Sequence, residues 1–88
     1  MSSRTIRLVY LARLREAFGS PGEAVDVPVE VGTVGALAEW LAGRGGAFAV
    51  ELAPGRAVRA AVNHAVARSD TPVRPGDEVA LFPPVTGG

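Results

Sequence analysis

The sequence "VALFPPVTGG", residues 79–88, joins an apolar segment to two prolines and two glycines. The branched and aromatic side chains before the prolines are typical of a β-strand, which we expect over residues 78–82. Pro83 and Pro84 fix φ and favour an extended backbone, so the chain is expected to leave this strand as a stiff arm. This arrangement predicts a folded domain that ends with an apolar strand and carries a projecting tail.

The tail ends in Gly87 and Gly88. Glycine has no Cβ, so a terminal Gly-Gly can enter a channel that is too narrow for ordinary side chains. We therefore predict one domain over residues 1–82 and a projecting C-terminal tail over residues 83–88.

The order of elements upstream predicts an α+β roll. Alternating apolar residues indicate further strands over residues 5–12, 23–29, 57–63 and 64–68, the last two as a hairpin. One amphipathic helix is expected after Thr33, with an apolar stripe formed by Val34, Leu37, Ala38 and Leu41. Residues 13–22 indicate a turn or short helix. The sequence does not indicate a role for residues 43–56. Five strands and one helix predict a sheet with a single covered face.

The first and last strands carry apolar residues on both faces. We expect one set to face the helix, namely Ile6, Leu8, Tyr10, Val79 and Leu81. The alternate set must then point outward: Val9, Leu11, Ala80 and Phe82. An exposed apolar patch of this kind usually marks a surface for a partner protein, so these four residues form the predicted partner interface.

Charge and hydropathy exclude two classes of partner. Nine cationic side chains, all arginine, balance nine acidic ones, so the chain has no excess positive charge to neutralise phosphates or anionic lipids. The longest purely apolar run covers only residues 8–12, too short to cross a membrane or to form a signal-peptide core. We expect no nucleic-acid or membrane partner and a cytoplasmic protein.

Conventional catalytic machinery is nearly missing. The chain has no cysteine and one histidine, His64, so a thiolate nucleophile and a cysteine or histidine metal cluster are excluded. Asp77 and Glu78 adjoin each other, but neighbouring residues on a strand point to opposite faces. We predict no metal site and no enzymatic activity of the chain on its own, which leaves the tail as the functional group.

A resemblance is carried by "IRLVYLARLREAFG", residues 6–19, and "AAVNHAVARSDTPVRPGDEVALFPPVTGG", residues 60–88. Together they closely resemble the small subunits of molybdopterin synthase, a family of ubiquitin-like β-grasp sulfur carriers. The likeness covers essentially the whole chain and is weaker over residues 20–59. One departure is Leu11 and Leu81, where aromatic residues are frequent in the family. The resemblance implies a β-grasp (ubiquitin-like) roll, with a mixed sheet of about five strands and one main helix on one face.

The resemblance also implies a mechanism centred on Gly88. An ATP-dependent adenylating enzyme would activate the Gly88 carboxylate, and a sulfur donor protein would convert it to a thiocarboxylate. The tail would then insert into the large subunit of molybdopterin synthase through Pro83, Pro84, Val85, Thr86 and Gly87. There it would pass sulfur to cyclic pyranopterin monophosphate during molybdenum cofactor biosynthesis. The chain would be a non-catalytic sulfur-donating subunit without a bound cofactor, and ATP would belong to the activating enzyme.

Other functions share the fold and the ending. A thiamine-pathway sulfur carrier also ends in Gly-Gly, although the Pro83-Pro84 spacer argues against it. A ubiquitin-like modifier that conjugates to lysines, or a non-covalent adaptor, is the other class. The identities of the activating enzyme and the sulfur donor, the assembly stoichiometry and dual use as a modifier stay open.

Overall fold

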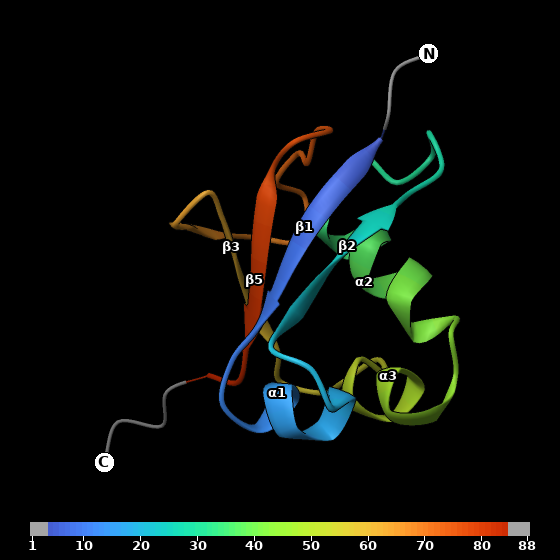
Figure 1. The fold of residues 1–88 in the computed structure, drawn as a ribbon, viewed down its shortest axis with the longest axis vertical. Coiled ribbons are helices and arrows are strands. Elements are labelled where there is room, and N and C mark those ends of the chain that lie inside the picture. Colours follow the sequence, from blue (N-terminus) through green and yellow to red (C-terminus); the bar gives the residue numbers. More distant parts are fainter. Residues whose placement is uncertain (1–3, 85–88) are drawn as a thin grey trace.

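A five-stranded sheet with the order β2-β1-β5-β3-β4 forms the framework of the molecule (Figure 1). The structure is a computed structural model and describes residues 4–84. The strands are β1 (Thr5–Tyr10), β2 (Gly22–Asp26), β3 (Arg59–Val62), β4 (Ala65–Ala67) and β5 (Glu78–Phe82). Central strands β1 and β5 are parallel, whereas the other neighbours are antiparallel. The predicted α+β roll with a mixed five-stranded sheet is confirmed.

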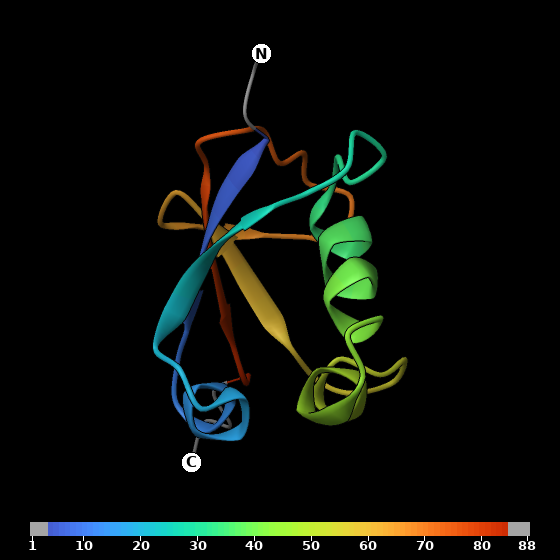
Figure 2. The same ribbon diagram turned by 45° about the vertical axis from the view of Figure 1, so that its right-hand side comes forward.

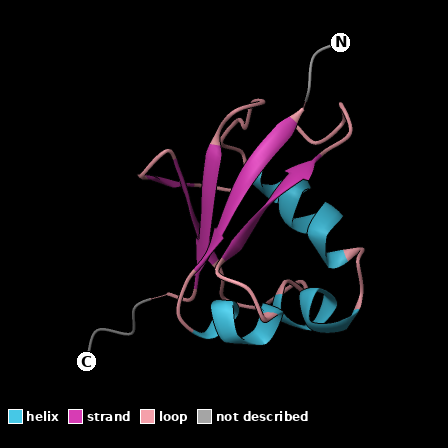
Figure 3. Ribbon diagram, viewed as in Figure 1, coloured by secondary structure: helices cyan, strands magenta, loops and turns pink. Residues whose placement is uncertain are grey.

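The main helix, α2 (Val34–Ala42), covers one face of the sheet (Figure 2). It begins at Thr33, whose Oγ1 accepts a hydrogen bond from the Ala36 amide at 3.1 Å, as predicted for an N-cap. Two short helices, α1 (Arg13–Phe18) and α3 (Gly46–Glu51), lie near one end of the strands (Figure 3). Within residues 4–84, no helix is long and apolar enough to cross a membrane.

The core lies between α2 and the central strands. Its most deeply buried side chains are at most 2% exposed and include Ile6, Leu8, Tyr10, Leu37, Leu41, Val79 and Leu81. Burial of each large apolar side chain contributes about 1.5–3 kcal/mol to folding. The five residues expected to face the helix are therefore confirmed in the core.

The first two strands are shorter than predicted. β1 ends at Tyr10 because Ala12 has a positive φ of 52°, which breaks the extended backbone, and α1 begins at the next residue. β2 ends at Asp26, two residues before Pro28, which has no N–H to donate to a ladder. The expected edge position of this strand is confirmed by the sheet order.

The β3–β4 hairpin is also confirmed, although both strands are shorter than expected. Asn63 and His64 have φ of 50° and 73°, so they supply the two left-handed positions that a two-residue hairpin requires. The Asn63 side chain donates to Asp77 Oδ1 and accepts from the Glu78 amide, each at 3.0 Å. These bonds join the hairpin to the start of β5. They stabilise the positive φ of Asn63, so that the turn can form without glycine.

Helix α3 was not predicted from the sequence. Gly45 and Gly46, with φ of 80° and 57°, allow the sharp change of direction between α2 and α3. The Phe48 ring then stacks on Phe18 with centroids 4.2 Å apart and lies edge-on to Tyr10 at 6.1 Å. Helix α3 has only six residues and is held by aromatic rings that are far from it in the sequence. It therefore gives no clear local pattern, and the periodicity of the sequence does not reveal it.

Candidate functional site

The predicted tail follows directly from the end of β5. Pro83 and Pro84 are half-buried and line a surface hollow of about 490 Å³. The same hollow is lined by Arg13, Gly55, Arg56 and Ala57. The remaining predicted tail residues, Val85, Thr86, Gly87 and Gly88, lie outside the described residues. The described part of the tail thus leaves the sheet beside α1 and the segment that follows α3.

The four residues of the predicted partner interface come together on the sheet face opposite the core. Val9 and Ala80 are paired across the parallel strands β1 and β5. Leu11 follows β1, and its amide donates to the Leu81 carbonyl at 3.1 Å, which keeps it alongside the end of β5. Phe82 is half-buried and Leu11 is 43% exposed.

Two further apolar residues extend this face, and sequence reasoning missed both. Ala61 on β3 is paired with Ala80 and, on its other side, with Val66 on β4. Val66 is 78% exposed. The signal for both residues is the hairpin register, which places every second residue of β3 and β4 on the outer face. We call these six residues the open-face patch: Val9, Leu11, Ala61, Val66, Ala80 and Phe82.

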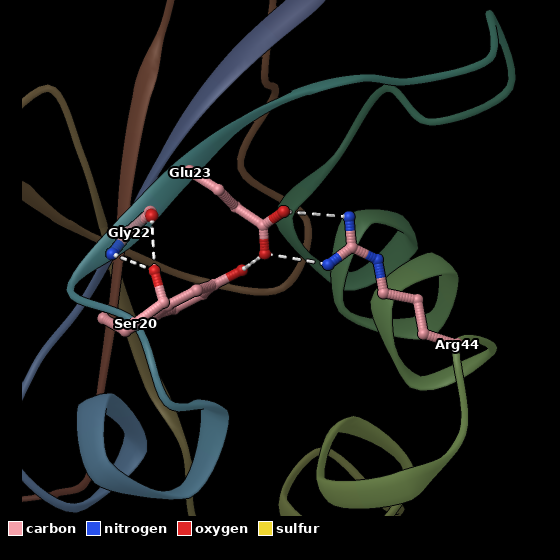
Figure 4. Close-up of polar contacts among 5 residues, drawn as sticks. Ser20, Gly22, Glu23 and Arg44 are labelled. Atoms are coloured by element: carbon pink, nitrogen blue, oxygen red, sulfur yellow. Dashed lines mark hydrogen bonds and ion pairs between the residues drawn. The ribbon is translucent and has the colours of Figure 1, made fainter.

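A polar cluster lies at the other edge of the sheet. The Arg44 guanidinium donates to both carboxylate oxygens of Glu23, at 2.8 and 3.2 Å (Figure 4). The Tyr10 hydroxyl donates to Glu23 Oε2 at 2.7 Å. Figure 4 also shows Ser20, whose Oγ donates to the Gly22 carbonyl and accepts from the Gly22 amide where β2 begins.

These contacts lower the pKa of Glu23 and raise the pKa values of Tyr10 and Arg44. The hydrogen bond from Arg44 lowers the pKa of Glu23, assisted by the Tyr10 hydroxyl and opposed by partial burial. Burial raises the pKa of Tyr10, and the neighbouring Glu23 carboxylate raises it further. Because Tyr10 is fully buried, the cluster offers no accessible phenol to a ligand, and its role is to hold the connection after α2 against β2.

The titratable residues singled out in the sequence have local contacts. His64 is exposed at the hairpin turn, with Nε2 3.6 Å from Glu78 Oε2. Asp77 accepts hydrogen bonds from Asn63 and from the Arg74 amide, so its carboxylate stabilises the turn before β5. Among residues 4–84, no group of three or more His, Cys, Asp or Glu side chains could hold a metal ion.

A cleft of about 410 Å³ lies on the covered face, between α2 and the β3–β4 hairpin. Small side chains at Gly35, Ala38, Ala60 and Ala67 leave this space open. No residue of the open-face patch or of the described tail lines it. We therefore place the candidate site on the other face, where the patch meets the tail.

The comparisons with known proteins point to one family. The model of the ThiS family matches residues 8–88. The molybdopterin synthase sulfur carrier subunit of Escherichia coli is 40% identical over 83 residues, covering 94% of this chain and 99% of that protein. The subunit of the same name from Haemophilus influenzae is 34% identical over the same shares of the two chains.

Solved structures agree with the fold. Small archaeal modifier protein 1 of Haloferax volcanii matches with a TM-score of 0.73 and 28% identity, over 93% of this chain and 99% of that chain. A chain in the complex of subunits 1 and 2 of molybdopterin-converting factor from Helicobacter pylori shares the fold, with a TM-score of 0.62 and 19% identity over 96% and 99% of the two chains. These matches support the predicted ubiquitin-like β-grasp fold. The chain belongs to the ThiS family and is a relative of the molybdopterin synthase sulfur carrier subunits.

Proposed function

We propose that this chain is the sulfur carrier subunit of a molybdopterin synthase and that it carries sulfur as a thiocarboxylate on Gly88. It binds the large synthase subunit, which supplies the catalytic groups, and is itself the sulfur-donating and non-catalytic subunit. The relatives that are 40% and 34% identical over 94% of the chain support this assignment by their names.

One observation carries the proposal. Strand β5 contributes Ala80 and Phe82 to the open-face patch and continues without interruption into Pro83 and Pro84. A partner that binds this patch therefore fixes the position and direction of the strand from which the tail leaves. Docking of the face and insertion of the tail become one event, as a carrier that delivers a group on its terminus requires.

The chemistry begins at the Gly88 carboxylate. One of its oxygens attacks the α-phosphorus of ATP in the active site of the adenylating enzyme, which forms an acyl-adenylate and releases pyrophosphate. The terminal sulfur of a persulfide on the donor protein then attacks the acyl carbon and displaces AMP, which leaves an acyl disulfide between Gly88 and the donor. A thiol of the activating system attacks the donor-side sulfur and breaks the S–S bond, so that the thiocarboxylate is released on Gly88 and the two thiols are left as a disulfide. A sulfur carrier without cysteine is consistent with this scheme, because the sulfur is held on the backbone terminus.

Delivery takes place inside the large subunit. The thiocarboxylate sulfur forms a C–S bond at a side-chain carbon of the pyranopterin substrate, from which an oxygen substituent leaves. Hydrolysis of the resulting thioester adds the oxygen of a water molecule to the acyl carbon, which returns Gly88 to a carboxylate and leaves the sulfur on the pterin as a thiolate. Each tail delivers one sulfur atom, whereas a dithiolene contains two. Carrier chains must therefore be exchanged and reloaded, so the interface has to be specific but reversible.

Intact-mass measurement of the native protein tests this function. The chain purified with its large subunit is expected to contain a fraction heavier by one oxygen-to-sulfur replacement. That fraction should increase when the adenylating enzyme, ATP and the sulfur donor are added, and it should fall when pyranopterin substrate is supplied. A terminus that stays a carboxylate under all these conditions contradicts the proposal.

A second candidate is a protein modifier, which the likeness to the archaeal modifier supports. After the same adenylation, a lysine amine of another protein would attack the acyl carbon, displace AMP, lose a proton and form an isopeptide bond. The chain has no lysine of its own, because all nine cationic side chains are arginine. Isopeptide-linked adducts on other proteins, found without any thiocarboxylate, would favour this function.

A further inference from the structure

Three arginines lie around the point where the tail leaves the sheet. Arg13 and Arg56 line the hollow of about 490 Å³ together with Pro83 and Pro84. Arg59, on β3, is exposed and paired with Phe82, the last residue of β5. We call Arg13, Arg56 and Arg59 the tail-end arginines.

The tail-end arginines carry an excess of positive charge. Glu51 lies 3.4 Å from Arg13 Nε and 3.1 Å from Arg56 Nη2, so one carboxylate is shared by two guanidinium groups. The Glu51 side chain is only 14% exposed, whereas those of Arg13 and Arg56 are 53% and 43% exposed. Because a guanidinium has five N–H donors, both arginines keep donors for a second carboxylate.

The opposite end of the same face is different. There Arg7 is paired with Glu78 across β1 and β5, and the preceding turn holds both Arg74 and Asp77, so two cationic side chains are balanced by two carboxylates. The chain as a whole has no net charge. Arg56 and Arg59 also line the cleft on the covered face. The positive charge is therefore a local feature of the end of the molecule from which the tail leaves, and not a property of the whole surface.

We infer that the partner which receives the tail presents aspartate or glutamate side chains around the mouth of its channel, and that the tail-end arginines bind them. This inference rests on the proposed function and specifies the partner surface. Guanidinium groups bind carboxylates through paired, charge-assisted hydrogen bonds. Opposite charges at the rim of an interface also accelerate encounter and orient the two proteins before they dock.

The position of the arginines favours protein carboxylates over the phosphates of ATP. Adenylation takes place at Gly88, four residues beyond Pro84. Four residues reach up to ~14 Å when fully extended, so the length of the tail allows the reacting phosphate to lie well beyond the point where the tail leaves the sheet. Arginines beside Pro83 and Pro84 are therefore suited to the entrance of the channel.

Association kinetics with the large synthase subunit, measured without nucleotide over a series of NaCl concentrations, test the inference. The triple variant Arg13→Gln, Arg56→Gln, Arg59→Gln should associate at least about tenfold more slowly at low salt and show a weaker salt dependence. Arg59→Gln alone should show part of this loss, and it leaves the contacts to Glu51 in place. Arg74→Gln removes the same charge from the turn before β5, at the other end of the strand, and should change the rate less than about twofold.

The outcomes separate the inference from the proposed function. Suppose that the wild-type chain binds the large subunit, and that the triple variant and Arg59→Gln both associate at the wild-type rate and with the wild-type salt dependence. The inference is then wrong, while the proposed function stands. If Arg74→Gln slows association as much as Arg59→Gln does, the inference is also wrong, because the rate would then depend on the total charge of the chain and not on the position of the arginine. If the folded wild-type chain does not bind the large subunit, both proposals fail. Thermal melts of each variant establish that it is folded.

Discussion

Arg44 donates hydrogen bonds to both carboxylate oxygens of Glu23, and this pair joins the turn after α2 to the edge strand β2. The guanidinium also lies 4.9 Å from the Phe48 ring centre and 5.5 Å from that of Trp40. One side chain thus connects the edge of the sheet, the end of α2 and helix α3. The contacts of Arg44 give residues 43–51 a role in stability that the sequence did not assign.

Arg44→Ala should destabilise the fold by about 1–2 kcal/mol, because it removes a partly exposed, paired hydrogen bond and two cation–π contacts. For a domain of this size, this corresponds to a fall in Tm of about 4–16 °C. Arg44→Lys keeps the charge but not the planar fork, so it should restore less than half of the loss. Thermal and urea unfolding measure the stability of both Arg44 variants. Arg74→Ala, which removes an arginine from another part of the surface, is the matched control. A Tm for Arg44→Ala equal to that of wild type would show that the pair contributes nothing.

The Glu23 carboxylate should make stability depend on acidity. Its pKa is lowered in the folded protein from an unfolded value of 4.5, so its stabilisation is fully present above pH 4.5. This stabilisation is lost as the pH falls through the folded pKa. The difference in unfolding free energy between wild type and Glu23→Gln should therefore be constant near neutral pH and shrink below pH 4.5. If the difference in unfolding free energy between wild type and Glu23→Gln does not change with pH, the charge of the Glu23 carboxylate does not contribute to stability.

The sequence predicts those parts of the fold that depend on local periodicity. The alternation that buries Val79 and Leu81, and the stripe of α2 that begins after Thr33, can both be seen within one segment. The Glu23–Arg44 pair cannot be predicted in this way, because 21 residues separate the two side chains and only the tertiary fold brings them together. Helix α3 is missed for the same reason.

The open face was predictable to the extent that strand alternation determines it. Val9, Ala80 and Phe82 follow from period two within their own strands. Ala61 and Val66 join them only through the register of the hairpin, which depends on the left-handed turn at residues 63–64. The charge around the tail was not predicted, because it depends on loops that bring Arg13 and Arg56 to the same hollow.

Phe82→Asp should weaken binding to the large synthase subunit by roughly 1–4 kcal/mol, because it places a charge in the apolar patch of the interface. The fold should survive, since Phe82 lies on the face opposite the core. Val66→Asp tests the extension of the patch to β4 in the same titration. Val29→Asp, at a valine that is 73% exposed outside the patch, is the control and should bind like wild type. Wild-type affinity of a folded Phe82→Asp variant would mean that the interface lies elsewhere.

Replacement of Pro83 and Pro84 by glycine should leave adenylation possible but slow the transfer of sulfur. A flexible arm loses more conformational entropy when it enters the partner, by about 0.5–1 kcal/mol for each proline removed. Synthase turnover is compared between double variant and wild type after both have been fully converted to thiocarboxylates, so that activation does not limit the rate. Equal turnover would contradict the role of a stiff spacer.

The position of the terminal carboxylate should matter as much as its chemistry. Adenylation requires a carboxylate oxygen in line with the α-phosphorus of ATP, and misplacement by about an ångström can cost about a hundredfold in rate. Deletion of Gly88 moves the carboxylate back by ~3.5 Å of extended chain, which the stiff Pro83-Pro84 segment cannot recover. Addition of one alanine after Gly88 moves it forward and introduces a Cβ where the channel admits none.

Both variants should keep the wild-type Tm and bind the large subunit through the open-face patch, yet form no thiocarboxylate by intact mass and support no dithiolene synthesis. A non-covalent adaptor would tolerate both changes, so full sulfur transfer by either variant, with its terminus unprocessed, would falsify the carrier function.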